Sequence, residues 1–194
     1  TFDFRETVAL APGYLVREFT RDGRRCFSYA MDRPMMNFHA YLSGRWDVRK
    51  GDYKGLPIEV YHDPRHGYNV DRMIDSAKKS LGYFEQIVSP YQHRQLRIIE
   101  FPGYADFAQS FANTIPYSET IGFITDLRDP DEIDYVFYVT AHEVAHQWWA
   151  HQEAGAAMQG AEMTTETFAQ YSALMVLEKE YGRDQMRKFL EFEM

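Results

Sequence analysis

One short stretch of the chain carries residue types that bind metal ions in proteins. It is His142-Glu143-Val144-Ala145-His146, an H-E-x-x-H pattern. Residues four apart on a helix lie on one face about one turn along, so both imidazoles can reach a single metal ion. A catalytic zinc ion takes three protein ligands and keeps one position for water or substrate. The pattern therefore predicts a site for one zinc ion, with a third ligand still to be found.

Glu143 has a different expected role, because it lies one step round the helix from His142. Zinc lowers the pKa of a water molecule bound to it, and a nearby carboxylate can accept the proton when that water attacks a carbonyl group. We expect Glu143 to be this catalytic base. Such a pattern on a helix is typical of zinc metallopeptidases.

The third ligand is expected from a helix that packs against the first. Glu166 precedes Ala169 and Ala173, whose small side chains allow two helices to approach closely. Glu162 lies four residues earlier on the same helical face and is a second available carboxylate. The spacing alone leaves both glutamates open as ligands.

Other histidines lack this geometry. His62 and His66 are also four apart, but Pro64 between them forbids the helix that would align them. We therefore interpret both as loop histidines. His151 follows His146 by five residues and points elsewhere on a helix, so we expect a polar residue at the helix end.

The hydrophobic pattern predicts which elements position these residues. Strands are expected first and helices later, which is an α+β arrangement, and the periodicity changes near Asp63-Pro64. The expected strands cover 14–19, 25–30, 37–42, 56–61 and 96–101, with an edge strand over 119–125. The expected helices cover 69–88, 131–151 and 161–181, and another begins near residue 184.

Composition narrows the class of protein. The net charge of the 194 residues is -8 and no Lys/Arg-rich block is present, so we expect no nucleic acid partner. Cys26 is the single cysteine, which excludes an intramolecular disulfide and a cysteine-based zinc site. The chain begins with Thr1 and ends inside a helix-like pattern without a stop signal, so we expect a piece of a longer protein.

Two stretches together resemble the aminopeptidase N family of gluzincin metallopeptidases, in which H-E-x-x-H-Q-W is followed by N-E-G-F-A. They are HEVAHQWW at 142–149 and TETFAQY at 165–171. The resemblance implies that Glu166 is the third zinc ligand. It also implies a thermolysin-like zinc metallopeptidase catalytic core over residues 63–194, truncated at its C-terminus. Residues 1–62 would be a β-rich segment that ends an N-terminal β domain.

A third similarity to the family concerns the substrate. The family has G-x-M-E-N-x-G before the zinc helix, and the glutamate of that motif binds the free amino group of the substrate. The aligned stretch here is 116–122, in which Glu119 and Gly122 match and the other positions differ. The resemblance thus implies that Glu119 binds the amino end of a peptide substrate, which would make the protein an aminopeptidase.

The chain also departs from the family. Nineteen residues separate His146 from Glu166, one more than is usual, and the tyrosine that stabilises the oxyanion in the family would lie beyond Met194. The sequence HQWWAHQ at 146–152, with the long spacing to Glu166, is similar to that of a bacterial branch of the family in which the peptidase-like domain is fused to ABC-transporter-type permease segments. We therefore expect a soluble domain of a membrane-associated parent protein. The alternative function is a zinc-stabilised, non-catalytic binding or regulatory domain of a membrane transporter.

Overall fold

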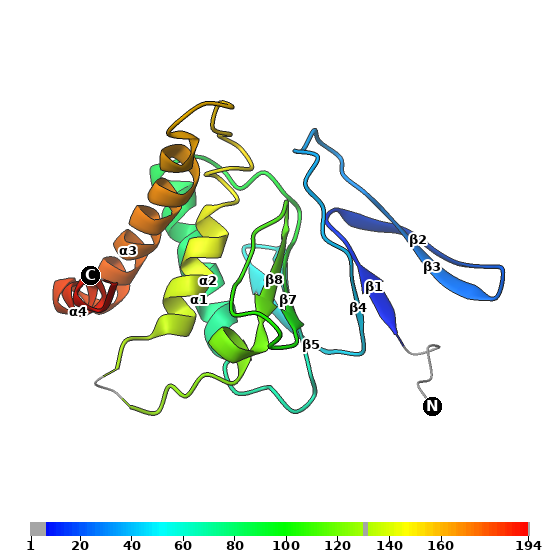
Figure 1. Cartoon of the computed structure of the whole chain (residues 1–194), viewed down its shortest axis with the longest axis horizontal. Helices are drawn as coiled ribbons and strands as arrows, with labels where there is room; N and C mark the ends of the chain where they lie inside the picture. The colour runs from blue at the N-terminus through cyan, green and yellow to red at the C-terminus, as the bar shows by residue number, and fades with distance from the viewer. Residues whose placement is uncertain (1–6, 130–131, 194) are drawn as a thin grey trace.

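The computed structural model describes residues 7–129 and 132–193. Its strands are β1 Val8–Leu10, β2 Tyr14–Arg21, β3 Arg24–Ala30, β4 Leu42–Gly44, β5 Asp47–Tyr53, β6 Leu56–His62, β7 Leu96–Phe101 and β8 Thr114–Ser118 (Figure 1). Its α-helices are α1 Val70–Ile87, α2 Tyr135–Ala145, α3 Phe168–Tyr181 and α4 Arg183–Glu193. Two short π-helical segments, η2 Glu119–Phe123 and η3 Met163–Thr167, precede α2 and α3.

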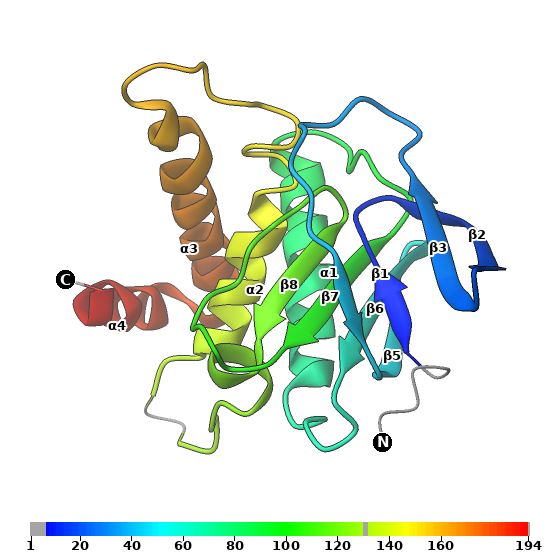
Figure 2. The same cartoon turned by 45° about the vertical axis from the view of Figure 1, so that its right-hand side comes forward.

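A mixed four-stranded sheet forms the centre of the fold, with its strands in the order β5-β6-β7-β8. β5 and β6 form an antiparallel hairpin, whereas β6, β7 and β8 run parallel. Parallel neighbours need a crossover connection, which α1 supplies between β6 and β7. Figures 1 and 2 show α1 and α2 on one side of this sheet and β1 to β4 on the other, with α3 next to α2.

Burial explains why these elements hold together. In α1, Met73, Ala77, Leu81 and Phe84 recur at steps of three and four residues and are at most 1% exposed, which gives the helix one apolar face. β7 and β8 are buried along their whole lengths, because other elements cover both of their faces. α2 is buried on most sides, since it lies between α1 and α3.

The N-terminal strands are fastened to the sheet by a buried cation. Arg97 on β7 is 3% exposed, and its Nη2 donates to the carbonyl oxygens of Ala11 at 2.7 Å and Gly13 at 2.6 Å. The N–H of Gly13 in turn donates to Oδ1 of Asn113, just before β8, at 3.2 Å. Gly13 has a φ of 98°, a conformation that favours glycine. Residues 11–13 therefore sit on the sheet in one defined arrangement.

The boundary predicted at residue 62 falls at the end of β6. β5 and β6 lie before it, yet both belong to the same sheet as β7 and β8. A division there would separate β7 from its parallel neighbour β6, so the sheet favours a division before β5. The assignment of residues 1–62 and 63–194 to two domains stays a prediction.

Most predicted helices are present, but the one that carries the histidines is shorter than expected. α1 matches the prediction over 69–88, η3 and α3 lie within 161–181, and α4 begins at Arg183. α2 ends at Ala145 and the chain continues in turns, so the prediction of a helix to residue 151 is wrong; residue 131 lies outside the described residues. Within residues 7–129 and 132–193, we find no helix long and apolar enough to cross a lipid bilayer.

Two strand predictions are also wrong. Residues 119–125 are not an edge strand: the strand is β8, and η2 follows it. The side chain of Asn69 donates to the carbonyl oxygens of Gly122 at 2.7 Å and Thr125 at 2.8 Å, which holds this segment in a compact turn. Residues 37–41 are irregular, and β4 begins at Leu42. Phe38 there stacks on Phe111 with ring centroids 4.4 Å apart, so a tertiary contact replaces strand pairing.

Candidate metal centre

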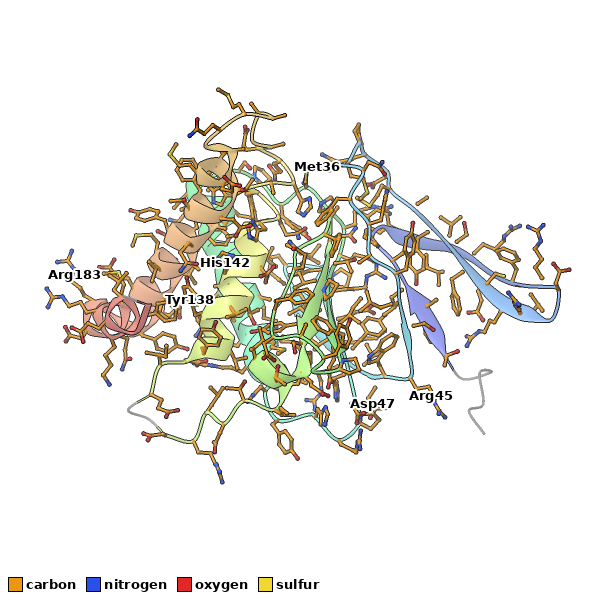
Figure 3. The ribbon with its side chains drawn as sticks, viewed as in Figure 1. Met36, Arg45, Asp47, Tyr138, His142 and Arg183 are labelled. Atoms are coloured by element: carbon orange, nitrogen blue, oxygen red, sulfur yellow. The ribbon has the colours of Figure 1, made fainter. Side chains whose placement is uncertain are left out.

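The last turn of α2 presents both histidines of the H-E-x-x-H pattern. The backbone N–H of His146 donates to the carbonyl oxygen of His142 at 3.2 Å, so the helical register that the spacing requires is present. The Nε2 atoms of the two rings lie 3.0 Å apart. Figure 3 locates His142 on α2, beside α3. The pair therefore faces the helix from which a third ligand was expected.

Glu166, in η3, offers a candidate third ligand atom. Its Oε2 lies 3.5 Å from Nε2 of His142 and 3.3 Å from Nε2 of His146. Ligands about 2.0 to 2.2 Å from a tetrahedral zinc ion lie about 3.3 to 3.6 Å from one another. The three atoms come close to such a triangle, so the residues present fit a metal ion. Glu162, the rival carboxylate, is not a member of this group.

The protonation pattern also suits a metal ligand. Nδ1 of His146 lies 3.0 Å from the carbonyl oxygen of Trp149, so Nδ1 is held as a donor and Nε2, which faces Glu166, is the atom left for a metal ion. Burial lowers the pKa of His146, but the hydrogen bond to Glu166 and the charge of Glu143 outweigh it and raise that pKa. Hydrogen bonds from His142 and His146 hold the pKa of Glu166 well below its usual value. The carboxylate is therefore ionised, as a ligand must be.

Glu143 is placed differently from His142, His146 and Glu166, which together form the candidate metal group. It is 5% exposed, and its Oε2 has no hydrogen-bond partner among the described residues. Burial raises the pKa of Glu143, while the nearby His142 and His146 counteract part of this effect. A buried carboxylate of raised pKa beside a metal group is suited to accepting a proton.

Two side chains of the turn that follows α2 make hydrogen bonds to other parts of the fold. The side chain of Gln147 is fully buried; its Nε2 donates to Oγ of Ser110 at 2.6 Å, and its Oε1 accepts from the N–H of Asn113 at 2.8 Å. Trp148 donates from Nε1 to the carbonyl oxygen of Ser89 at 2.9 Å, after α1. These partners lie just before β8 and just after α1, and such tertiary contacts can override helix propensity where α2 ends.

Glu119 contacts a different set of residues from the candidate metal group. Its Oε1 accepts from the N–H of Gly103 at 2.8 Å, and its Oε2 is 3.6 Å from Nδ1 of His66. Asn113, which bonds to Gln147, and Glu119 lie at opposite ends of β8. The role of Glu119 as the anchor of a substrate amine stays a prediction, and the contacts of this side chain do not include the metal group.

Three other histidines, His62, His66 and His151, make hydrogen bonds within the fold. Nδ1 of His66 lies 2.5 Å from Oε1 of Glu100, within hydrogen-bonding distance. His62 bonds through Nδ1 to the carbonyl oxygen of Asp63 at 2.8 Å. His151 donates from Nε2 to the carbonyl oxygen of Ser110 at 3.2 Å, and burial lowers its pKa to about 4. His151 is thus a half-buried, neutral residue of the turn.

Comparisons with known proteins identify the fold. Neither the comparison with protein-family models nor that with curated proteins found a match. Among solved structures, a crystal structure of Legionella pneumophila aminopeptidase A in complex with aspartic acid matches with a TM-score of 0.79 and 20% sequence identity. The match covers 94% of this chain and 22% of that one, so this chain spans less than a quarter of its length. The chain thus has an α+β fold, with N-terminal β-strands, that matches part of an aminopeptidase.

Proposed function

We propose that this chain is the core of a zinc-dependent peptidase. His142, His146 and Glu166 would hold one zinc ion, and Glu143 would be the catalytic base. The observation that carries the proposal is the convergence of three ligand atoms, from α2 and η3, within 3.5 Å of one another. The similarity of the fold to that of an aminopeptidase supports it.

The residues have separable tasks in such a reaction. Zinc held by the three side chains would polarise the scissile carbonyl group and make a water molecule more acidic. Glu143 accepts the proton of the attacking water and returns it to the leaving amine. The burial of Glu143 favours this cycle, because it raises the pKa of the carboxyl group above its usual value.

We propose a peptide as the substrate, cut at its amino end. The structure to which the fold is similar contains aspartic acid, which supports a substrate built of amino acids. If Glu119 binds the substrate's amino group, Glu119→Gln should raise KM for aminoacyl substrates and change kcat little. An unchanged KM would remove Glu119 from the proposal without affecting the zinc site. A membrane-associated parent protein also stays a proposal.

The Glu143→Gln variant tests the function directly. In the whole protein that carries this chain, the variant should bind zinc like the wild type, because Glu143 is not in the ligand group. It should hydrolyse aminoacyl reporter substrates at least about a hundredfold more slowly, since the general base is lost. Retained full activity would refute the role of Glu143. Tight zinc binding by the wild type without any turnover would instead favour the non-catalytic binding domain.

A further inference from the structure

Trp149 contacts both sides of the metal group, and we propose that it is a positioning residue for the bound ion. The inference rests on the proposed zinc site. Through its main chain Trp149 orients His146, and through its indole ring it reaches α3, the helix that continues from the segment carrying Glu166. It would set the distance between the histidine pair and the third ligand.

The contact with His146 is made by the main chain. The carbonyl oxygen of Trp149 accepts the Nδ1 proton of His146 at 3.0 Å, which leaves the Nε2 lone pair free to face the ion. The N–H of Trp149 donates to the carbonyl oxygen of Ala145 at 3.0 Å, so the turn itself is held against the end of α2. The orientation of one ligand ring therefore depends on where this turn lies.

The contact with α3 is made by the side chain. Nε1 of Trp149 donates to Oγ of Ser172 at 2.8 Å, and its ring packs edge-on against Phe168 with centroids 5.3 Å apart. Ser172 is 5% exposed and lies on the same buried stripe as Ala169 and Ala173. Among the described residues we find no other hydrogen bond from the turn 146–153 to α3.

Glu166 needs such a tie, because burial does not hold it in place. Its side chain is 57% exposed, and none of the five residues of η3 is buried. The fully buried Ala169 and Ala173 allow α3 to approach α2, but side chains this small do little to prevent sliding along the helix axis. A directional hydrogen bond at Ser172 fixes the position of α3 along its axis relative to α2. It thereby also fixes the position of Glu166 relative to the two histidines.

The Trp149→Phe variant tests this inference. It removes the indole N–H and keeps an aromatic ring and the main-chain carbonyl group. We expect the Kd for Zn²⁺, measured in competition with a chromophoric chelator, to rise about tenfold, as is usual when a supporting contact is lost. With Co²⁺ in place of zinc, the visible absorption band should lose intensity, because one ligand no longer completes the tetrahedral set.

Trp148→Phe is a matched control. Trp148 is 1% exposed and donates from Nε1 to Ser89, on the side of α1 rather than α3. The control should lower the melting temperature of the metal-free protein and leave the Kd within about twofold of the wild type. A loss of stability alone would thus move Tm in both variants, but only the positioning contact would move the Kd and the Co²⁺ spectrum.

Ser172→Ala removes the same hydrogen bond from its other end and decides the matter if Trp149→Phe does not fold. It should reproduce the tenfold rise in Kd, and the double variant should add little, since both changes break one bond. Wild-type affinity in both single variants, or an equal loss in Trp148→Phe, would overturn the role of Trp149. A wild-type protein that binds neither Zn²⁺ nor Co²⁺ would instead refute the proposed function.

Discussion

At the scale of single residues, two glutamates a short distance apart are prepared for different tasks by their surroundings. Glu166 lies largely in solvent, and its hydrogen bonds to His142 and His146 lower its pKa. Glu143 is buried one position after His142, and that burial raises its pKa. Environments that push two carboxyl pKa values apart separate a permanent anion from a group that exchanges protons. In this molecule the anion is suited to be a ligand and the other group to be the base.

Glu166 and its rival Glu162 offer a matched test of the ligand set. Glu166→Gln removes a charged ligand and should raise the Kd for Zn²⁺ by at least about a hundredfold, more than the loss of a supporting contact produces. Glu162→Gln makes the same chemical change four residues earlier, outside the ligand group, and should leave the Kd nearly unchanged. Competition with a chelator measures both. A stronger effect from Glu162→Gln would mean that the wrong glutamate has been assigned.

Residue-level prediction worked where a regular element fixes the geometry. The helical spacing of His142 and His146 alone predicted that their rings would meet, and they do. The choice of Glu166 over Glu162 needed the family resemblance, because both lie on one face of a helix. The role of Glu119 rests on two matching positions in a short motif of the family, and it stays a prediction. The contacts of Trp149 had no sequence signal.

At the scale of elements, the start of α2 is held by one side chain with two functions. Oδ1 of Asp134 accepts from the N–H of Phe137 at 2.9 Å, which caps the helix. The same carboxylate pairs with Arg72 on α1. An Asp134→Ala change loses both contacts, whereas Asp134→Asn keeps a good cap and loses only the charge pair.

These two variants separate capping from charge pairing. We expect Asp134→Ala to lower the free energy of unfolding by about 1 to 2 kcal/mol and Asp134→Asn to lower it less, because asparagine caps about as well as aspartate. Chemical denaturation of each variant measures the difference. Equal losses would assign the effect to the pair with Arg72 instead. The histidines lie at the opposite end of α2 from Asp134. Fraying at the start of the helix should therefore leave zinc affinity unchanged until the whole helix unfolds.

Element boundaries were less predictable than element types, for physical reasons that particular residues show. β8 contains Pro116, which cannot donate a hydrogen bond to a neighbouring strand and so disfavours a strand assignment. β5 was missed because its residues are mostly charged and exposed, as suits the edge of a sheet. α2 ends early because Gln147 and Trp148 make tertiary hydrogen bonds that no local propensity encodes.

At the scale of the whole molecule, hydrogen bonds connect the N-terminal strands to the metal group. Gly13 donates to the side chain of Asn113, and the N–H of Asn113 donates to Gln147, the residue after His146. Arg97 holds the same N-terminal turn from β7. Although the strands β1 to β4 carry none of the candidate ligands, their packing thus bears on where α2 ends. The match to an aminopeptidase across 94% of the chain includes most of this N-terminal part.

Stability of the whole fold should depend on pH through His93. It is 7% exposed, neither ring nitrogen has a hydrogen-bond partner among the described residues, and burial, with a contribution from His151, lowers its pKa to about 4. In the unfolded chain the pKa returns to about 6.5. The unfolded state therefore binds more protons between these values, and stability falls as the pH is lowered from about 6.5 to 4.

A His93→Phe variant isolates this contribution. Phenylalanine keeps a ring that can pack against Tyr91, whose centroid lies 5.5 Å from that of His93, and it has no proton to gain. We expect the variant to lose less stability than the wild type on acidification, by on the order of 3 kcal/mol at pH 4. Denaturant unfolding at several pH values measures both curves. Because other acid-sensitive groups such as Glu166 are common to both proteins, their effects cancel in the difference; parallel curves would show that His93 is not protonated on unfolding.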